Sequence, residues 1–501
     1  MTLSSNNVIV IGAGFGGLAA GIRLQAAGKQ VTIVEALDQP GGRAGCLHEQ
    51  GFTFDMGPTL ITAPHLLQDL WESTGGRLED DLDLIRLEPY YRIFFPDGAY
   101  FDCGSDEVAI EREIARFNPA DVPGFRAFLA ATRELYSRAF VDLARKPFHE
   151  LSSFLAIVPE LVKLGAIRSV YSYTSQFIQD PRLRTIFSFH PLFIGGSPLR
   201  ASAIYSIIPY LERLGGVHFA RGGMTALVNA LVNRFESLGG TLRLRSPVTR
   251  IGVQDGRIRG VELGDGSRLV SNIVVSNADA TRTYMELLPS HVRKPLNRAR
   301  YRAYQHSMSC YLIYLGLSRQ YAQLRHHTVI MPDRYQEMIR EVFDGQGLPN
   351  ELALYVHAPT RTDPSLAPPG GESLYILAPV PHLGHGINWA KADQPFRDRI
   401  MNYLEHNFGL EDLERSIVVE RRFNPTDFAT RLRSWQGAAF SIEPTLLQSA
   451  YFRPHNRQSE VPGLYLVGAG THPGAGLPGT LLSAEITSGL ILGSELSGPQ
   501  H

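Results

Sequence analysis

Cysteine is scarce in this chain, which has only three cysteines among 501 residues. Cys46, Cys103 and Cys310 lie far apart, so they form no CxxC redox pair, no thiol-rich metal motif and no disulfide framework. We therefore expect no metal site. The few, separated thiols also fit a chain that works in a reducing compartment, and we expect it in the cytoplasm.

The sequence also lacks an excess of charge of one sign and a long apolar run. Its 48 Lys and Arg against 49 Asp and Glu give a net charge of −1, which creates no global field to attract nucleic acid. No stretch reaches the roughly 18 apolar residues that span a bilayer. The first apolar run, Val8–Ile11, has no basic segment before it, unlike a signal peptide. We expect no nucleic-acid partner, no membrane span and no signal peptide.

A glycine-rich turn follows that first apolar run. Val8–Ile11 is typical of a buried strand, Leu18–Ala27 of a helix and Val31–Val34 of a second strand, and this order predicts a parallel sheet. The turn residues are Gly12, Ala13, Gly14, Phe15, Gly16 and Gly17. Such glycines allow a pyrophosphate to approach a helix N-terminus, and Glu35 at the end of the second strand can accept hydrogen bonds from ribose hydroxyls. The motif predicts a dinucleotide site and leaves NAD and FAD open.

Two further glycine segments extend this predicted site. Gly42 and Arg43 follow shortly after Glu35, so the guanidinium would lie at the same edge of the sheet and could pair with phosphate oxygens. Near the other end of the chain, 463–496 repeats the order of strand, glycine turn and helix. The residues expected at the cofactor there are Gly470, Gly479 and Thr480. A second positive helix N-terminus suits FAD, because it would stabilise the anionic reduced ring.

The remaining patterns place the chain in the α/β class and divide it into three expected parts. Residues 1–104, 217–290 and 456–501 together form a discontinuous Rossmann-like cofactor domain. Residues 105–216 are helical and rich in aromatic side chains. Residues 291–455 mix strands and helices, and we interpret them as a β-sheet domain that binds the substrate.

Over essentially its whole length the chain resembles the bacterial-type phytoene desaturases, a family of FAD-dependent carotenoid desaturases. The matching stretches are 464–480, Gly51–Thr59, Phe187–His190, Arg221–Gly223, Ser276–Asp279, Ala378–Leu383 and Phe452–Asn456. The resemblance implies an FAD-binding domain of the GR2/amine-oxidase type, with FAD as the redox cofactor. It adds to the expected cofactor contacts Gly57, Pro58, Thr59, Val248 and Asn277.

The resemblance also implies a reaction. The family removes hydrogen pairs stepwise from phytoene, toward neurosporene or lycopene, and oxygen or a quinone would reoxidise the flavin. Family-like position makes His190, His382 and His472 weak candidates for a catalytic base. Because the substrate is insoluble, we expect the helical residues 105–216 to contact lipid, with the protein peripherally associated with the cell membrane.

Three alternatives stay open at this point. Desaturases of C30 or hydroxylated carotenoids share the same glycine motifs. Rab GDP-dissociation inhibitors share the fold but carry isoprenoids without redox activity, which the intact glycine motifs argue against. Amine oxidases often link the flavin to a cysteine, whereas Cys310 lies far in sequence from Gly470.

Overall fold

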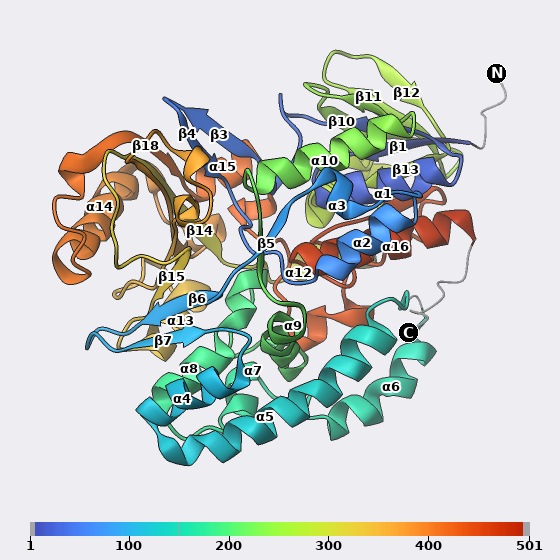
Figure 1. The fold of residues 1–501 in the computed structure, drawn as a ribbon. Coiled ribbons are helices and arrows are strands. Elements are labelled where there is room, and N and C mark those ends of the chain that lie inside the picture. The colour runs from blue at the N-terminus through green and yellow to red at the C-terminus, as the bar shows by residue number, and fades with distance from the viewer. Residues whose placement is uncertain (1–5, 149, 494–501) are drawn as a thin grey trace.

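A five-stranded parallel sheet brings the two ends of the chain together (Figure 1) in the computed structural model, which describes residues 6–148 and 150–493. Its strands, in order across the sheet, are β19 (Leu464–Leu466), β13 (Ile273–Ser276), β1 (Asn7–Ile11), β2 (Gln30–Val34) and β9 (Thr241–Arg243). The parallel pairing of β1 with β2 confirms the predicted β-α-β start.

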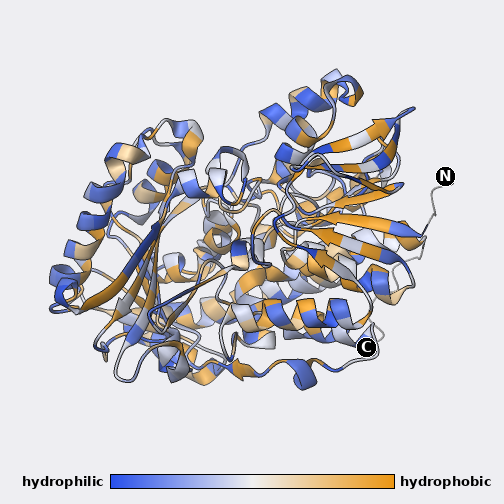
Figure 2. Ribbon diagram, turned by 90° about the horizontal axis from the view of Figure 1, so that it is seen from above, coloured by the Kyte–Doolittle hydropathy of each residue, from blue (hydrophilic) through white to orange (hydrophobic). Residues whose placement is uncertain are grey.

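Alternate residues of β1 face two different layers, because successive side chains of a strand point to opposite sides. Val8 and Val10 pack in one core with three helices, and Ile9 and Ile11 pack in another with a three-stranded antiparallel sheet. The helices are α1 (Phe15–Ala26), α10 (Met224–Ser237) and α16 (Leu477–Leu492), and the antiparallel strands are β10 (Val248–Gln254), β11 (Arg257–Leu263) and β12 (Arg268–Val270). Burial on both faces explains why β1 and β13, in the middle of the sheet, are apolar along most of their length (Figure 2).

A second, seven-stranded sheet forms the other half of the molecule. In order across the sheet its strands are β18 (Ile417–Phe423), β14 (Ser309–Leu317), β17 (Glu372–Val380), β16 (Leu354–His357), β15 (His327–Ile330), β6 (Tyr91–Phe94) and β7 (Tyr100–Cys103). The strands expected within 291–455 are all present in it. We expected the first segment of the cofactor domain to extend to residue 104. The structure differs, because β6 pairs with β15 and β7 pairs with β6, so residues 91–103 complete the seven-stranded sheet. Alternating side chains reveal a strand but not the sheet in which it pairs.

Helices occupy most of the described residues between 105 and 216, as predicted, and they run along one side of both sheets (Figure 1). They are α4 (Glu107–Phe117), α5 (Val122–Leu135), α6 (Leu151–Lys163), α7 (Val170–Thr174), α8 (Pro181–Ser188) and α9 (Ile207–Gly215). Across the described residues, no helix is both long enough and apolar enough to span a membrane.

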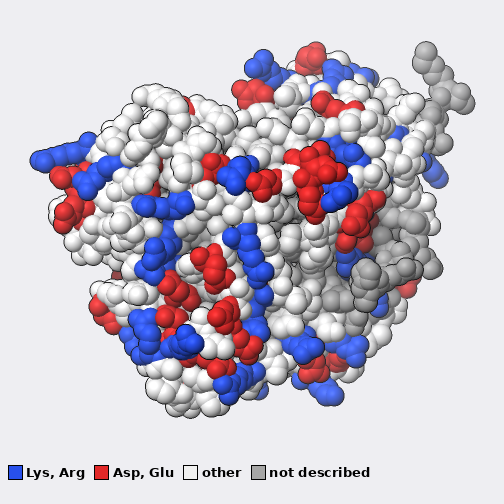
Figure 3. Space-filling view, viewed as in Figure 1, with Lys and Arg blue, Asp and Glu red and all other residues white. Residues whose placement is uncertain are grey.

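Shorter elements connect these parts. The strands are β3 (Cys46–Glu49), β4 (Phe52–Asp55), β5 (Leu84–Arg86) and β8 (His218–Ala220). The helices are α2 (Pro64–Glu72), α3 (Leu78–Asp81), α11 (Ala280–Arg282), α12 (Pro295–Ala303), α13 (Tyr335–Asp344), α14 (Trp389–Asn402) and α15 (Pro425–Thr430). On the face seen in Figure 3, charged side chains of both signs are interspersed.

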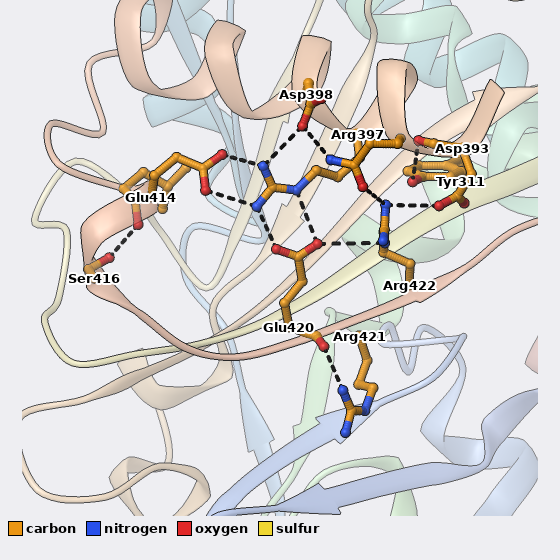
Figure 4. A network of polar contacts seen from close by, with 11 residues as sticks. Tyr311, Asp393, Arg397, Asp398, Glu414, Ser416, Glu420, Arg421 and Arg422 are labelled. Carbon is orange, nitrogen blue, oxygen red and sulfur yellow. Dashed lines mark hydrogen bonds and ion pairs between the residues drawn. The ribbon is translucent and has the colours of Figure 1, made fainter. Parts of the chain in front are cut away.

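One ion-pair network fixes α14 on the seven-stranded sheet (Figure 4). The guanidinium of Arg397 donates from Nε to Glu420 Oε1 over 3.0 Å and from Nη2 to Glu414 Oε2 over 2.9 Å. Only 11% of the Arg397 side chain is exposed, so both carboxylates are needed to compensate its desolvation. The network thereby fixes α14 against β18.

Candidate functional site

A single cavity of about 570 Å³ collects side chains from segments far apart in the sequence. This volume lies in the range typical of cofactor and ligand sites. The predicted cofactor residues that line it are Gly12, Gly14, Phe15, Gly16, Glu35, Gly42, Arg43, Gly57, Pro58, Thr59, Val248, Asn277, Gly470, Gly479 and Thr480. Gly17 does not line the cavity, since it packs behind the turn. The structure therefore brings the predicted set together.

The N-terminal turn is so tight that side chains are excluded from it. Gly12 has φ +94°, a conformation that residues with a side chain rarely adopt. A Cβ added at Gly16 would lie 2.6 Å from Asn277 Oδ1, and one at Gly17 would lie 2.0 Å from the carbonyl oxygen of Gly12. These contacts explain why glycine is required in the turn, and they leave its backbone open to a ligand at the start of α1.

Glu35 follows β2 and is 6% exposed, with its carboxylate at the cavity wall. Its Oε2 accepts from the amide of Ala13 over 2.7 Å, and its Oε1 accepts from the amide of Leu37 over 2.9 Å. Each carboxylate oxygen retains a further acceptor site. The geometry suits two ribose hydroxyls, as the motif predicts.

The two glycine segments meet directly. A Cβ on Gly16 would lie 3.1 Å from the Cα of Gly468 and 3.1 Å from Cγ2 of Thr480. The first turn of α16 begins after Gly476 and lines the same cavity as the start of α1. Two positive helix ends therefore face one space, an arrangement that suits an extended cofactor with a phosphate group and an electron-accepting ring.

Arg43 gives an independent indication of an anionic ligand. Its side chain lines the cavity, and Nη2 donates to Ser434 Oγ over 2.9 Å. Nε is buried without a hydrogen-bond partner, and no carboxylate pairs with this guanidinium among the residues that the structure describes. Burial lowers the pKa of Arg43, partly offset by Asp279. A phosphate oxygen would satisfy the unused donor, so the residues present fit FAD.

Only one of the three histidine candidates reaches the cavity. His472 is 5% exposed, lines the cavity and meets Phe148 edge to face at 5.3 Å between ring centroids. His190 lies behind the wall, with Nε2 2.8 Å from the Tyr91 hydroxyl. His382 is also absent from the lining, and burial lowers its pKa to about 4. The structure thus gives neither His190 nor His382 access to a substrate.

Sequence reasoning missed Glu212, a buried carboxylate at the apolar part of the cavity. It is 2% exposed, and Oε2 accepts from the Tyr91 hydroxyl over 2.8 Å. Oε1 has no hydrogen-bond partner in the described part of the chain. In the sequence Glu212 stands between Leu211 and Arg213, as expected on the polar side of a surface helix, so no local signal reveals it.

The apolar part of the cavity reaches the helical region. Its lining there combines aromatic and aliphatic side chains: Phe140, Phe148, Ile157, Leu161, Phe189, Leu192, Phe193, Ile207, Ile208 and Leu211. A long hydrocarbon would be desolvated along this wall.

We expect Asp55, in the matching stretch Gly51–Thr59, to make the stability of the protein depend on pH. Burial raises its pKa to about 7, although Asp55 Oδ1 accepts from the Met224 amide over 2.8 Å. The aspartate pKa of the unfolded chain is near 3.9. Between these two pKa values, the folded chain therefore binds a proton that the unfolded chain has lost. The free energy of unfolding should fall by up to about 4 kcal/mol from pH 4 to pH 8 on this account.

Replacing Asp55 with asparagine removes that titration. We expect urea unfolding at pH 5 and pH 8 to show that D55N loses less stability on alkalinisation than the parent chain. If D55N and the parent chain lost the same free energy of unfolding between pH 5 and pH 8, this would contradict the assignment.

Comparisons with known proteins identify the family of the chain. Residues 15–492 match the family of flavin-containing amine oxidoreductases. The chain is 46% identical over 488 residues to a lycopene-forming phytoene desaturase of Pseudescherichia vulneris, covering 97% of this chain and 98% of that protein. It is 40% identical over 496 residues to a neurosporene-forming phytoene desaturase of Rhodobacter capsulatus, covering 98% and 94%.

Solved structures confirm the fold. A putrescine oxidase variant matches with a TM-score of 0.65 at 15% identity, covering 97% of this chain and 98% of that structure. An oxidoreductase from Methanosarcina mazei matches with a TM-score of 0.63 at 18% identity, covering 95% and 98%. The predicted α/β fold of the amine-oxidase type and the FAD cofactor are thus confirmed, and the chain belongs to the flavin-containing amine oxidoreductase family, within which it groups with the bacterial phytoene desaturases as an FAD-dependent oxidoreductase.

Proposed function

We propose that this chain removes hydrogen from phytoene in successive steps toward neurosporene or lycopene. One observation carries the proposal: identity of 40–46% over nearly the whole chain to phytoene desaturases that form lycopene or neurosporene. The cavity supports it, because it joins the two glycine segments to a long apolar wall. The three expected parts of the chain then serve to bind the cofactor, admit the substrate and hold it.

The residues of the chain position the substrate and protect the reacting carbon. FAD, when bound, supplies the acceptor for a hydride taken from an allylic carbon. The wall formed by Phe189, Leu192 and Phe193 aligns the hydrocarbon and excludes water, which would otherwise add to the electron-poor polyene. Each new double bond also requires loss of one proton from the adjacent carbon. His472 lines the cavity and can accept this proton on a ring nitrogen.

Replacing His472 with glutamine should retain FAD and slow desaturation by about 100-fold, because general base catalysis typically contributes at least that factor. The rate of flavin reduction by phytoene in liposomes, measured in a single turnover, checks the expected loss of rate. The absorbance of bound FAD shows whether the variant retains the cofactor. The corresponding His382→Gln variant serves as the control, since His382 does not line the cavity. Equal reduction rates in H472Q and the parent chain would dismiss the assignment.

Expression in cells that accumulate phytoene tests the function as a whole. Pigment analysis should show neurosporene or lycopene, and the product reports the number of steps. Unchanged phytoene would reject the proposal, whereas conversion of a C30 or hydroxylated carotenoid alone would favour a related desaturase. Reoxidation of reduced enzyme by oxygen or by a quinone in liposomes identifies the electron acceptor, which we propose is one of these two.

We further propose that α6 docks on the cytoplasmic side of the cell membrane and admits the substrate. Leu155 and Val162 on this helix are 56% and 47% exposed, and Ile167 just beyond it is 62% exposed. Ile157 and Leu161 of the same helix line the cavity. One side of α6 therefore faces the cavity while the other presents apolar side chains outward, which suits a lipid surface.

The double variant Leu155→Glu, Ile167→Glu should sediment with liposomes at least about tenfold less well, because two apolar side chains no longer enter lipid. Leu296 is 81% exposed on α12, outside this helical region, so Leu296→Glu is the matched control. Sedimentation that is equal in the double variant and the control would contradict docking through α6.

A further inference from the structure

Three histidines gather where the seven-stranded sheet passes from β15 to β16. One ring nitrogen of each of His326, His327 and His357 lies within 4.8 Å of one ring nitrogen of the other two. His327 and His357 stand directly opposite each other across the two strands, and His326 precedes β15. All three are buried, with exposures of 6%, 0% and 0%. This cluster lies outside the cofactor cavity.

Burial favours the neutral form of all three imidazoles. Burial lowers the pKa of His326 to about 3, and burial together with the neighbouring histidines lowers the pKa of both His327 and His357 well below the usual value. A neutral imidazole keeps one nitrogen lone pair, whereas a protonated one has none. Each neutral ring offers one nitrogen lone pair to a ligand.

Two of these ring nitrogens lack any hydrogen bond. Nε2 of His327 and Nδ1 of His357 are buried without a partner in the described part of the chain. Leaving buried polar atoms unsatisfied costs about 1–3 kcal/mol each. An ion bound through Nε2 of each ring would satisfy Nε2 of His327, although not Nδ1 of His357.

The other ring nitrogens are held in the way that metal-ligating histidines are held. Nδ1 of His326 lies 2.6 Å from the Thr362 hydroxyl, and Nδ1 of His327 lies 2.6 Å from the Tyr355 hydroxyl. Such outer partners fix the tautomer and leave Nε2 as the ligand atom of each ring, although without an ion Nε2 of His326 shares a hydrogen bond with Nε2 of His357. Nε2 of His326 lies 3.1 Å from Nε2 of His357, close to the roughly 3.3 Å that separates two nitrogens bound tetrahedrally to zinc at about 2.05 Å.

We propose that His326, His327 and His357 bind one Zn²⁺ ion, with a water or hydroxide as the fourth ligand. Imidazole nitrogen is a preferred zinc ligand, and the cluster contains neither the carboxylate shell that Ca²⁺ or Mg²⁺ prefers nor a thiolate. The ion fixes the ring of His327 and, through it, Tyr355, whose hydroxyl lies 2.5 Å from Thr59 Oγ1 at the cavity wall. The proposal differs from our expectation of a chain without a metal site.

Equilibrium dialysis of the untagged, FAD-bound protein against Zn²⁺, followed by elemental analysis, tests the site. We expect one zinc per chain, a higher unfolding temperature with zinc, and a loss of at least about tenfold in affinity in His327→Gln and in His357→Gln. The matched control is His385→Gln, a histidine outside the cluster. Bound flavin and circular dichroism show whether each variant is folded.

Cobalt gives a test that needs no variant. Co²⁺ in a tetrahedral three-histidine site should produce visible absorption bands that Zn²⁺ displaces stoichiometrically. Absence of these bands together with no zinc retained after dialysis would overturn the proposal. So would zinc binding of equal affinity in the parent chain and a folded double variant, His327→Gln with His357→Gln.

Discussion

Alanine in place of Gly17 should yield a colourless protein that no longer holds FAD. The new Cβ would lie 2.0 Å from the carbonyl oxygen of Gly12, a backbone atom that cannot rotate away. Relief of this contact requires the turn to open, and the opening moves the amides at the start of α1 away from the phosphate position. We expect FAD affinity to fall at least about 100-fold, equivalent to about 2.7 kcal/mol. Flavin absorbance and titration of the apoprotein with FAD measure the loss.

Gly347→Ala is the control for this variant. A Cβ at Gly347 would have no atom within 4 Å, so the substitution adds a methyl group without a collision. This variant should remain yellow and active. A G17A protein that stays folded and binds FAD with the parent affinity would show that the turn does not position the cofactor.

Methionine in place of Arg43 should weaken FAD binding by about 10- to 150-fold, the range of one charge-assisted hydrogen bond of about 1.5–3 kcal/mol. The guanidinium is buried at the cavity wall, is paired with no described carboxylate and has an unused Nε donor. Methionine keeps much of the apolar stem while it removes the charge. FAD titration of the apoprotein at low and high salt measures both the affinity and its electrostatic share.

Two variants separate a lost phosphate contact from a general loss of stability. Arg43→Lys keeps the charge and should lose less affinity than R43M, although lysine cannot reproduce the planar fork. Arg421→Met removes a guanidinium that is 57% exposed and should leave FAD binding unchanged. Equal affinities in R43M and the parent chain would remove Arg43 from the cofactor site.

The glycine turns could be predicted from sequence because their requirement is local. Gly12 must take a positive φ and Gly17 must pack against a carbonyl only a few residues away, and both constraints act within one turn. The position of Glu35 follows in the same way from the length of one β-α-β unit. The structure places Gly12 and Glu35 at one cavity, with Gly17 packed behind the turn.

Other features depend on contacts between distant segments, which leave no local signal. The pairing of β6 with β15 joins residues more than 200 positions apart, so the boundary at 104 was placed without it. His190 is polar and lies in a family-like stretch, yet its ring faces Tyr91 rather than the cavity. The histidine cluster likewise forms only when strand register sets His357 opposite His327. Tertiary pairing decides each of these outcomes.

The adjacency of α1 and α16 has a consequence for biosynthesis. The start of α1 is synthesised before Gly468 and Thr480, which close against Gly16 and lie more than 450 positions later in the sequence. A nascent chain therefore lacks one of the two glycine segments of the cofactor site until α16 has been synthesised. A complete cradle for the coenzyme therefore exists only after both segments have been synthesised.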